Sequence, residues 1–193
     1  IMAYSYVLWD FNGTLLDDVG IGMEAINALL APRGLPTLKT RAEYHRHFQF
    51  PIEEYYRSVG FDFTKDPYDL LAREWIVQYR AREATAPLFP GATEALTYIK
   101  QQKIPQILFS ATQKEMLLQQ ISALGIDGWF DGVLGSDDIY ARGKIHLGKA
   151  WVEAVRPPRA LLVGDTVHDA RAAECMGIEC VLVATGHQSR ETL

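Results

Sequence analysis

The sequence lacks several features that would each assign it to a special class of protein. No apolar run approaches the roughly 18 residues that a membrane-spanning helix needs, so we expect no membrane association. The start of the chain does not resemble a signal peptide, which makes a reducing, cytoplasmic location the expectation. Positive charge is not in excess, because 19 Lys and Arg face 24 Asp and Glu. We therefore expect no nucleic-acid partner, since such a protein usually presents a basic face.

Cysteine is scarce as well. Cys175 and Cys180 lack the spacing and the neighbouring ligands of a metal site, and we expect both to be buried free thiols. What the sequence does have is 193 residues, of which 48% are hydrophobic. That length suffices for one domain with a modest insertion, and it can enclose a sizeable core.

Short apolar runs recur along most of the chain. They predict buried strands at residues 6–9, 104–109, 129–134, 160–163 and 180–183. Helical patterns lie between them, at residues 92–102, 114–124, 147–155 and 169–176. Strands that alternate with helices predict an α/β fold, here a Rossmann-like parallel sheet with helices on both faces.

The stretch after the first predicted strand breaks this alternation. It contains no convincing strand, and helical patterns occupy residues 19–30, 40–47, 52–59 and 67–82. We therefore predict a small all-helical cap domain, residues 17–86, inserted directly after the first strand. The α/β core domain would comprise residues 3–16 and 87–193.

Polar side chains stand at the ends of three predicted strands. Asp10 follows the first strand, Ser110 the second and Asp165 the fourth. Ligands of open parallel sheets bind at the carboxyl ends of the strands, so we expect these residues to share one site. Helix capping is the competing interpretation for Ser110 and Asp165, and a first-turn carboxylate favoured by the helix dipole is the competing one for Asp169.

Four short motifs occur in an order that resembles the haloacid dehalogenase superfamily. DFNGTL at residues 10–15 resembles its first signature, and GDTVHD at residues 164–169 resembles its fourth. Ser110 matches the second, and Lys144 matches the third, with Lys149 as a rival for that role. The chain looks most similar to the phosphoglycolate-phosphatase-like branch, whose members carry a helical type 1 cap.

The resemblance implies a phosphatase with Mg²⁺ as its cofactor. Asp10 would be the nucleophile that forms an aspartyl-phosphate. The Asp10 carboxylate, the Asn12 main-chain carbonyl and Asp165 would hold the metal, with Asp169 as a further ligand or a support from behind. Carboxylate attack on a phosphate dianion brings like charges together, and a metal that prefers oxygen ligands offsets this repulsion.

The same resemblance implies a set of groups that bind the transferred phosphoryl. Lys144 would neutralise Asp10 and the phosphoryl. Thr14, Ser110 and the main chain at Ala111 would donate hydrogen bonds to the phosphoryl oxygens. The expected substrate is a small phosphorylated metabolite, a phosphate monoester similar to phosphoglycolate.

Asn12 departs from the family pattern, which has aspartate at this position as the general acid and base. An amide cannot transfer that proton. A cap residue could supply it, with Glu53, Glu54 or His47 as candidates, or the substrate could have a leaving group that needs no protonation. The chain could instead be a slow phosphatase or a non-catalytic phosphate-ester binder, and the Asn12-Gly13 pair could also deamidate to aspartate.

The segment at residues 44–51 is the most unusual part of the predicted cap, since it is dense in aromatic and cationic side chains. We predict that it faces the substrate, with Arg46 and His47 as the specificity residues. Carbon–halogen cleavage is a competing chemistry for the fold, because a halide leaves without a proton. Asp165 and Asp169 argue against it, since halide displacement needs no metal.

Overall fold

A computed structural model describes residues 4–140 and 143–193. Its centre is a five-stranded parallel sheet with the strand order β3-β2-β1-β4-β5. The strands are β1 (Tyr6–Trp9), β2 (Gln106–Gln113), β3 (Gly132–Ser136), β4 (Ala160–Gly164) and β5 (Glu179–Leu182). The predicted parallel α/β fold is therefore confirmed.

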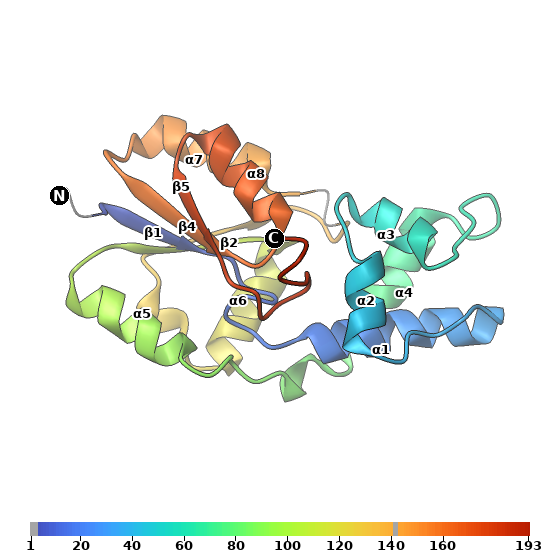
Figure 1. The fold of residues 1–193 in the computed structure, drawn as a ribbon. Coiled ribbons are helices and arrows are strands. Elements are labelled where there is room, and N and C mark those ends of the chain that lie inside the picture. Colours follow the sequence, from blue (N-terminus) through green and yellow to red (C-terminus); the bar gives the residue numbers. More distant parts are fainter. Residues whose placement is uncertain (1–3, 141–142) are drawn as a thin grey trace.

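Helices cover both faces of this sheet (Figure 1). One face carries α5 (Ala92–Gln101) and α6 (Lys114–Ala123), and the other carries α7 (Ile145–Val155) and α8 (Val167–Met176). Successive side chains of β1 point to opposite faces of the sheet, so one strand packs against both helix layers. Val7 and Trp9 pack with α5 and α6, whereas Leu8 packs with α8. A strand buried on both faces reads as a continuous apolar run, as β1 does.

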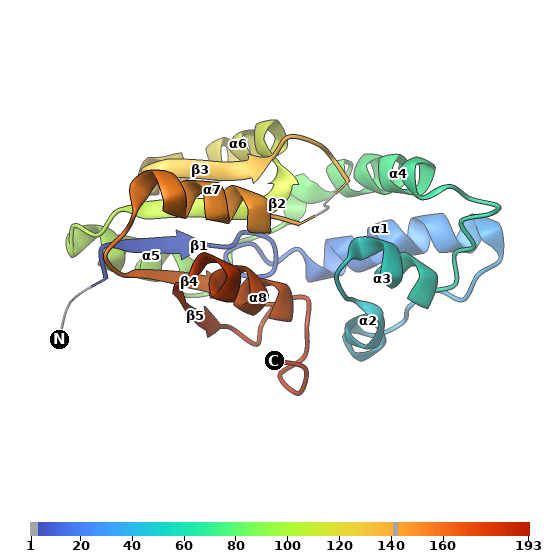
Figure 2. The same cartoon turned by 90° about the horizontal axis from the view of Figure 1, so that it is seen from above.

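The segment between β1 and α5 is helical, as predicted. It consists of α1 (Val19–Leu30), α2 (Arg41–His47), α3 (Ile52–Ser58) and α4 (Tyr68–Arg80), with 3₁₀ turns at Ala31–Arg33 and Glu83–Thr85. Figures 1 and 2 show these four helices gathered beyond the carboxyl ends of the strands. They enclose a hydrophobic cluster of their own, which includes Ile26, Leu29 and Leu71.

The structure differs from the sequence-based expectations at β3 and at the two cysteines. Residues 127–129 form a 3₁₀ turn and β3 begins at Gly132, so the strand predicted from residue 129 starts too early. Cys175 is exposed, because it lies on the outer face of α8, whereas Cys180 is half-buried. Residue 3, the predicted start of the core domain, lies outside the described residues. Within the part of the chain that is described, no helix is long and apolar enough to cross a membrane.

Candidate active site

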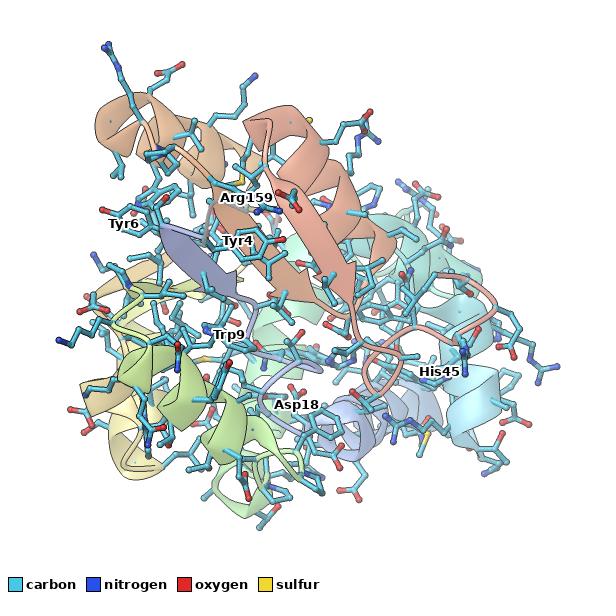
Figure 3. The ribbon with its side chains drawn as sticks, turned by 60° about the vertical axis from the view of Figure 1, so that its left-hand side comes forward. Tyr4, Tyr6, Trp9, Asp18, His45 and Arg159 are labelled. Atoms are coloured by element: carbon cyan, nitrogen blue, oxygen red, sulfur yellow. The ribbon has the colours of Figure 1, made fainter. Side chains whose placement is uncertain are left out.

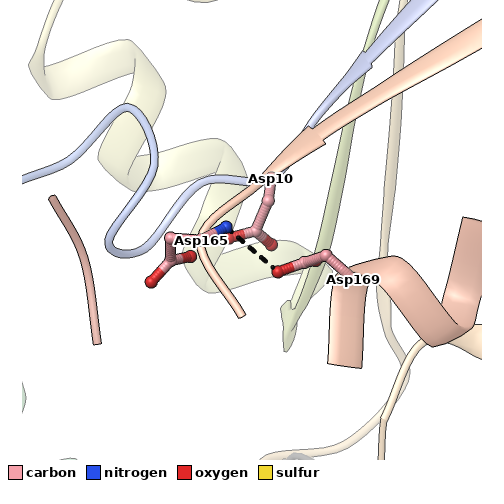
Figure 4. Close-up of side chains that lie close together, drawn as sticks. All are labelled: Asp10, Asp165 and Asp169. Atoms are coloured by element: carbon pink, nitrogen blue, oxygen red, sulfur yellow. Dashed lines mark hydrogen bonds between the residues drawn. The ribbon is translucent and has the colours of Figure 1, made fainter. Parts of the chain in front are cut away.

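Three carboxylates meet where two neighbouring strands end. Asp10 directly follows β1, Asp165 directly follows β4, and Asp169 lies in the first turn of α8. All three are buried, and one oxygen of each lies within 4.8 Å of the others (Figure 4). The parallel register of β1 and β4 brings Asp10 and Asp165 to the same edge although they are far apart in the sequence.

The start of α8 fixes the Asp169 carboxylate, and the loop after β5 fixes that of Asp165. Asp169 accepts hydrogen bonds at Oδ2 from the Thr166 main-chain N–H (3.0 Å) and hydroxyl (2.7 Å), which caps the helix and leaves Oδ1 for other partners. Asp165 accepts at Oδ2 from the main-chain N–H of His187 (2.7 Å). A Cβ at Gly186 would lie only 2.0 Å from that oxygen, so glycine is required there. Asp169 thus caps its helix and also contributes to the carboxylate cluster.

Lys144, at the start of α7, neutralises part of this charge. Its ammonium is 2% exposed and donates to Asp10 Oδ1, to Asp169 Oδ1 at 2.7 Å and to the Phe109 carbonyl at 2.9 Å. Lys149 is exposed on the same helix. The structure therefore brings Lys144, and not its rival, to Asp10.

Burial and charge shift the protonation of this cluster in opposite directions. Removal from water raises the pKa of Asp10 well above its ordinary value, and the neighbouring carboxylates add to the rise while Lys144 opposes it. Burial by itself would lower the pKa of Lys144, but Asp10 and Asp169 raise it, so the ammonium stays charged. The pKa of Asp169 is held low by Lys144 and by the Thr166 hydrogen bonds, although burial opposes this.

The predicted phosphoryl-binding groups surround the same point. Thr14 donates from its hydroxyl to Asp165 Oδ1 (3.0 Å) and to Asp10 Oδ2 (3.2 Å). Ser110 and Ala111 line the cavity beside Asp10, and the Ser110 hydroxyl accepts from the Thr112 main-chain N–H (3.1 Å). Ser110 therefore both stabilises the irregular end of β2, where the pairing with β3 shifts register, and contributes to the cavity wall.

The Asn12 side chain is held on three sides. Its Nδ2 donates to Asp18 Oδ2 (2.7 Å) and to the Tyr79 hydroxyl (3.0 Å), and its Oδ1 accepts from the Thr112 hydroxyl (2.8 Å). Such a set of partners suits an amide, which donates and accepts at the same time. An aspartate at position 12 would instead place a carboxylate oxygen against that of Asp18.

Asp18 forms a buried ion pair with His187 that the sequence analysis missed. The His187 Nε2 lies 3.2 Å from Asp18 Oδ1, and its Nδ1 lies 2.7 Å from the hydroxyl of Tyr44 in α2. Asp18 also accepts from the Gly13 main-chain N–H (3.0 Å). Figure 3 shows Asp18 at the transition from the strand-end loop into α1. The pair thus links the core, the first motif and the helical insertion.

The His187–Asp18 pair should make stability depend on pH. Burial alone would lower the pKa of His187, but Asp18 raises it to about 9, against 6.5 for an unperturbed histidine. The folded protein then binds more protons than the unfolded chain between these values. We expect the free energy of unfolding, measured by urea titration in EDTA, to decline as the pH rises from about 6.5 through about 9.

Asp18→Asn is the matched variant for this prediction. It keeps the size of the side chain and removes the charge that raises the pKa of His187. The decline over this pH range should be smaller in Asp18→Asn than in the wild type. Parallel pH profiles for the two proteins would show that the pair contributes no pH-dependent stability.

A cavity of about 160 Å³ lies beside Asp10 and is lined by residues of α2, α3 and α4. Neither Arg46 nor His47 lines it, although the segment that contains them does so through Tyr44, Phe48 and Phe50. Arg46 is exposed, and His47 bonds to the hydroxyl of Ser58 (2.7 Å). The remaining lining residues that come from these helices are Ile52, Tyr55, Tyr56, Tyr68, Ala72, Trp75, Ile76 and Tyr79.

The donor set suits a divalent cation. Asp18 and the three clustered carboxylates give four buried negative charges, and Lys144 and His187 supply two positive ones. The excess of two negative charges in a buried site is costly unless a cation balances it. Carboxylate oxygens within reach of one another are the ligands that Mg²⁺ prefers, so the residues fit this metal.

Comparisons with known proteins identify the family of this chain. The family model described as haloacid dehalogenase-like hydrolase matches residues 7–183. A phosphoglycolate phosphatase of Caulobacter vibrioides is 29% identical over 191 residues, which cover 94% of this chain and 79% of the relative.

Two solved structures share the fold. A haloacid dehalogenase-like family hydrolase from Streptococcus pneumoniae aligns with a TM-score of 0.83 at 22% identity, over 98% of this chain and 89% of that chain. CbbY from Rhodobacter sphaeroides, in complex with xylulose-(1,5)bisphosphate, aligns with a TM-score of 0.74 at 20% identity, over 98% and 89% of the two chains. The family predicted from the four motifs is confirmed, and the chain belongs to the haloacid dehalogenase-like hydrolases as a phosphoglycolate-phosphatase-like member.

Proposed function

We propose that this hydrolase is a magnesium-dependent phosphatase that cleaves a small organic phosphate monoester through an aspartyl-phosphate on Asp10. The observation that supports it most is the contact of Asp10 with Lys144, next to the carboxylates of Asp165 and Asp169. A nucleophilic carboxylate that must attack an anion needs positive charge close to it. The phosphoglycolate phosphatase name of the Caulobacter vibrioides relative supports the same chemistry.

The reaction would take place in two steps on one side chain. An Asp10 oxygen attacks phosphorus, a new O–P bond forms, and the ester oxygen leaves with the electron pair of the broken bond. Water then attacks phosphorus, and Asp10 regains its carboxylate as inorganic phosphate is released. Lys144, Thr14 and Ser110 hold the phosphoryl during both steps, in a site that the helical cap shields from water.

The metal would be held by Asp10, Asp165 and Asp169, with the Asn12 main-chain carbonyl as the further ligand that the motif implies. When bound, Mg²⁺ supplies charge stabilisation of the phosphoryl oxygens. The positions of the ligands and of the nucleophile are set by other residues of this chain. Thr14 orients two of the ligands. Lys144 opposes the rise that burial causes in the pKa of Asp10, and its ammonium holds the Asp10 carboxylate in place.

A steady-state assay of phosphate release tests this proposal directly. With a panel of small phosphate esters, we expect release in Mg²⁺ and a decrease of roughly 10³-fold or more in excess EDTA, since the metal contributes several kcal/mol of stabilisation. Readdition of Mg²⁺ should restore the rate, which separates metal loss from unfolding. Equal phosphate release with and without Mg²⁺ would refute metal dependence.

The role of Asn12 can be tested by exchanging it with Asp18. Asn12→Asp alone would set two carboxylates against each other, because Asn12 Nδ2 and Asp18 Oδ2 are 2.7 Å apart. The double variant Asn12→Asp with Asp18→Asn keeps one amide and one carboxylate in that hydrogen bond. It should hydrolyse an alkyl phosphate roughly 10²–10⁴ times faster than Asp18→Asn does, since it regains a general acid.

The single variant Asp18→Asn serves as the control for the lost ion pair with His187. An unchanged rate in the double variant would mean that another group already transfers the proton, or that proton transfer does not limit the rate. A burst of alcohol release in pre-steady-state kinetics distinguishes these two explanations, because the alcohol is the first product and its burst places the limiting step after ester cleavage.

A further inference from the structure

The wall of the cavity opposite Asp10 is aromatic and aliphatic. Every lining residue from α2 through α4 is a tyrosine, phenylalanine, tryptophan, isoleucine or alanine. Phe48 stacks on His187 with a centroid separation of 4.8 Å, and Phe50 stacks on His168 at 4.3 Å. Trp75 and Tyr79 stack at 4.8 Å on the α4 side. Rings thus form most of this wall.

Such a wall disfavours a substrate with a second anionic group. Among the described residues that line the cavity, Lys144 and His187 carry positive charge, and both are already paired, Lys144 with Asp10 and Asp169 and His187 with Asp18. A carboxylate on the substrate, such as that of phosphoglycolate, would therefore lie against rings without a cation of its own. Burying an unpaired charge in this way strongly disfavours binding.

Within the described ranges of the chain, no carboxylic acid stands free beside the position of the ester oxygen. His168 also lines the cavity, and its Nε2 has no partner among the described residues, but its ring is stacked on Phe50. Asn12 is an amide, and Asp18 accepts from Asn12, Gly13, Tyr79 and His187. Glu53, Glu54 and His47 do not line the cavity. A leaving oxygen would then depart without a proton, which favours alcohols that are themselves acidic. A phenol, with a pKa near 10, is a far better leaving group than an alkyl alcohol, whose pKa is close to the 15.7 of water.

We propose that the substrate is a phosphate monoester of a phenol-type alcohol with one aromatic ring. The apolar wall and the missing general acid are separate observations, and both favour this class. A cavity of about 150 Å³ holds benzene, so the 160 Å³ beside Asp10, which must also admit the phosphoryl, limits the apolar part of the ester to one ring. The inference rests on the proposed phosphatase function. In the step itself, Asp10 forms the new O–P bond and the phenolate oxygen leaves with its electron pair, later taking a proton from water.

The hydroxyl of Tyr55 supports a ligand in this cavity. Tyr55 is buried and lines the cavity, and its hydroxyl has no hydrogen-bond partner within the described part of the chain. Burying a hydroxyl without a hydrogen-bond partner is energetically unfavourable. A bound molecule that forms a hydrogen bond with the Tyr55 hydroxyl would remove this penalty. A polar substituent on the aromatic ring would serve as that partner.

A panel of three esters tests the proposal on the wild-type protein with Mg²⁺. Phenyl phosphate has the ring and the acidic alcohol, benzyl phosphate has the ring with an alkyl leaving group, and phosphoglycolate has neither. We expect kcat/KM for phenyl phosphate to exceed that for benzyl phosphate by roughly 10²–10⁴, the contribution of the missing acid. Benzyl phosphate should also inhibit more tightly than phosphoglycolate.

Two variants on α4 test the wall itself. Ile76→Arg introduces a cation at a lining position, whereas Val77→Arg introduces it at the next residue, which is 64% exposed and outside the lining. In Ile76→Arg, the ratio of kcat/KM for phosphoglycolate to that for phenyl phosphate should rise about tenfold or more, as a charge-assisted hydrogen bond provides. Val77→Arg should keep the wild-type ratio. Both kcat/KM values in a ratio come from the same protein sample. A smaller folded fraction therefore lowers both values equally and leaves the ratio unchanged.

The outcomes separate the substrate class from the phosphatase function. Higher kcat/KM for phosphoglycolate than for phenyl phosphate, or equal values for phenyl and benzyl phosphate, would overturn the substrate class and leave the phosphatase function intact. An unchanged ratio in Ile76→Arg would show that the ring does not meet this wall. Release of phosphate from none of the esters would overturn both proposals.

Discussion

Asp10→Asn is expected to lower kcat by roughly 10⁴- to 10⁶-fold, the range for loss of a catalytic nucleophile. An amide oxygen is too weak a nucleophile to attack phosphorus, so neither the aspartyl-phosphate nor its hydrolysis would occur. The change also removes the ion pair with Lys144, which would lower catalysis further. Phosphate release from phenyl phosphate in Mg²⁺ measures the effect.

Two further readouts make this prediction specific to the nucleophile. Wild-type protein quenched in acid during turnover should carry one phosphoryl group by mass spectrometry, and Asp10→Asn should carry none. Far-ultraviolet circular dichroism should show that the variant keeps its fold. Phosphorylation at another residue, or residual activity above about 1% of the wild type, would assign the nucleophile elsewhere.

The sheet edge could be predicted from the sequence because parallel topology constrains it. β1, β2 and β4 are adjacent, so the residues that end their apolar runs must lie side by side. The shared location of Asp10, Ser110 and Asp165 follows from that rule alone. The choice of Lys144 over Lys149 depended on the family resemblance, and its ammonium does lie at Asp10.

The cap side of the site was harder to predict because its contacts depend on helix direction. Tyr44 and Phe48 are four residues apart and share the helix face that looks into the cavity, whereas Arg46 lies between them on another face. Helical spacing within the segment could have pointed to the aromatic pair. The charge of a phosphate ester favours a cationic cap instead, and Arg46 and His47 are the residues that this criterion selects.

The His187–Asp18 pair had no usable sequence signal. The two residues are 169 positions apart and belong to no motif with a fixed spacing. Their contact arises because the loop after β5 returns to α2, where His45 bonds to the Gly186 carbonyl (3.0 Å) and Tyr44 bonds to His187. Figure 3 shows His45 beside that loop. Tertiary geometry alone creates such a pair.

Lys144→Met is expected to lower the free energy of unfolding by about 3–5 kcal/mol in EDTA, because it leaves Asp10 and Asp169 buried without their cation. Methionine has similar length and preserves the packing, so charge accounts for the loss. For a chain of this size, the thermal midpoint should fall by roughly 6–20 °C. Differential scanning calorimetry measures the change.

Mg²⁺ should recover part of this stability, since it supplies positive charge to the same carboxylates. The increase in thermal midpoint on adding Mg²⁺ should therefore be larger in Lys144→Met than in the wild type. Activity should nevertheless stay roughly 10²–10³-fold below the wild type, because the metal does not replace a donor directed at the phosphoryl.

Lys149→Met provides the matched control, since it removes the same charge from an exposed position on the same helix. It should change the free energy of unfolding by no more than about 0.5 kcal/mol and leave kcat unaltered. Equal losses in the two variants would mean that the net charge of α7 matters more than the contact with Asp10. A loss confined to Lys144→Met, reduced by Mg²⁺, would instead identify its ammonium and the metal as two cations that balance one cluster of carboxylates.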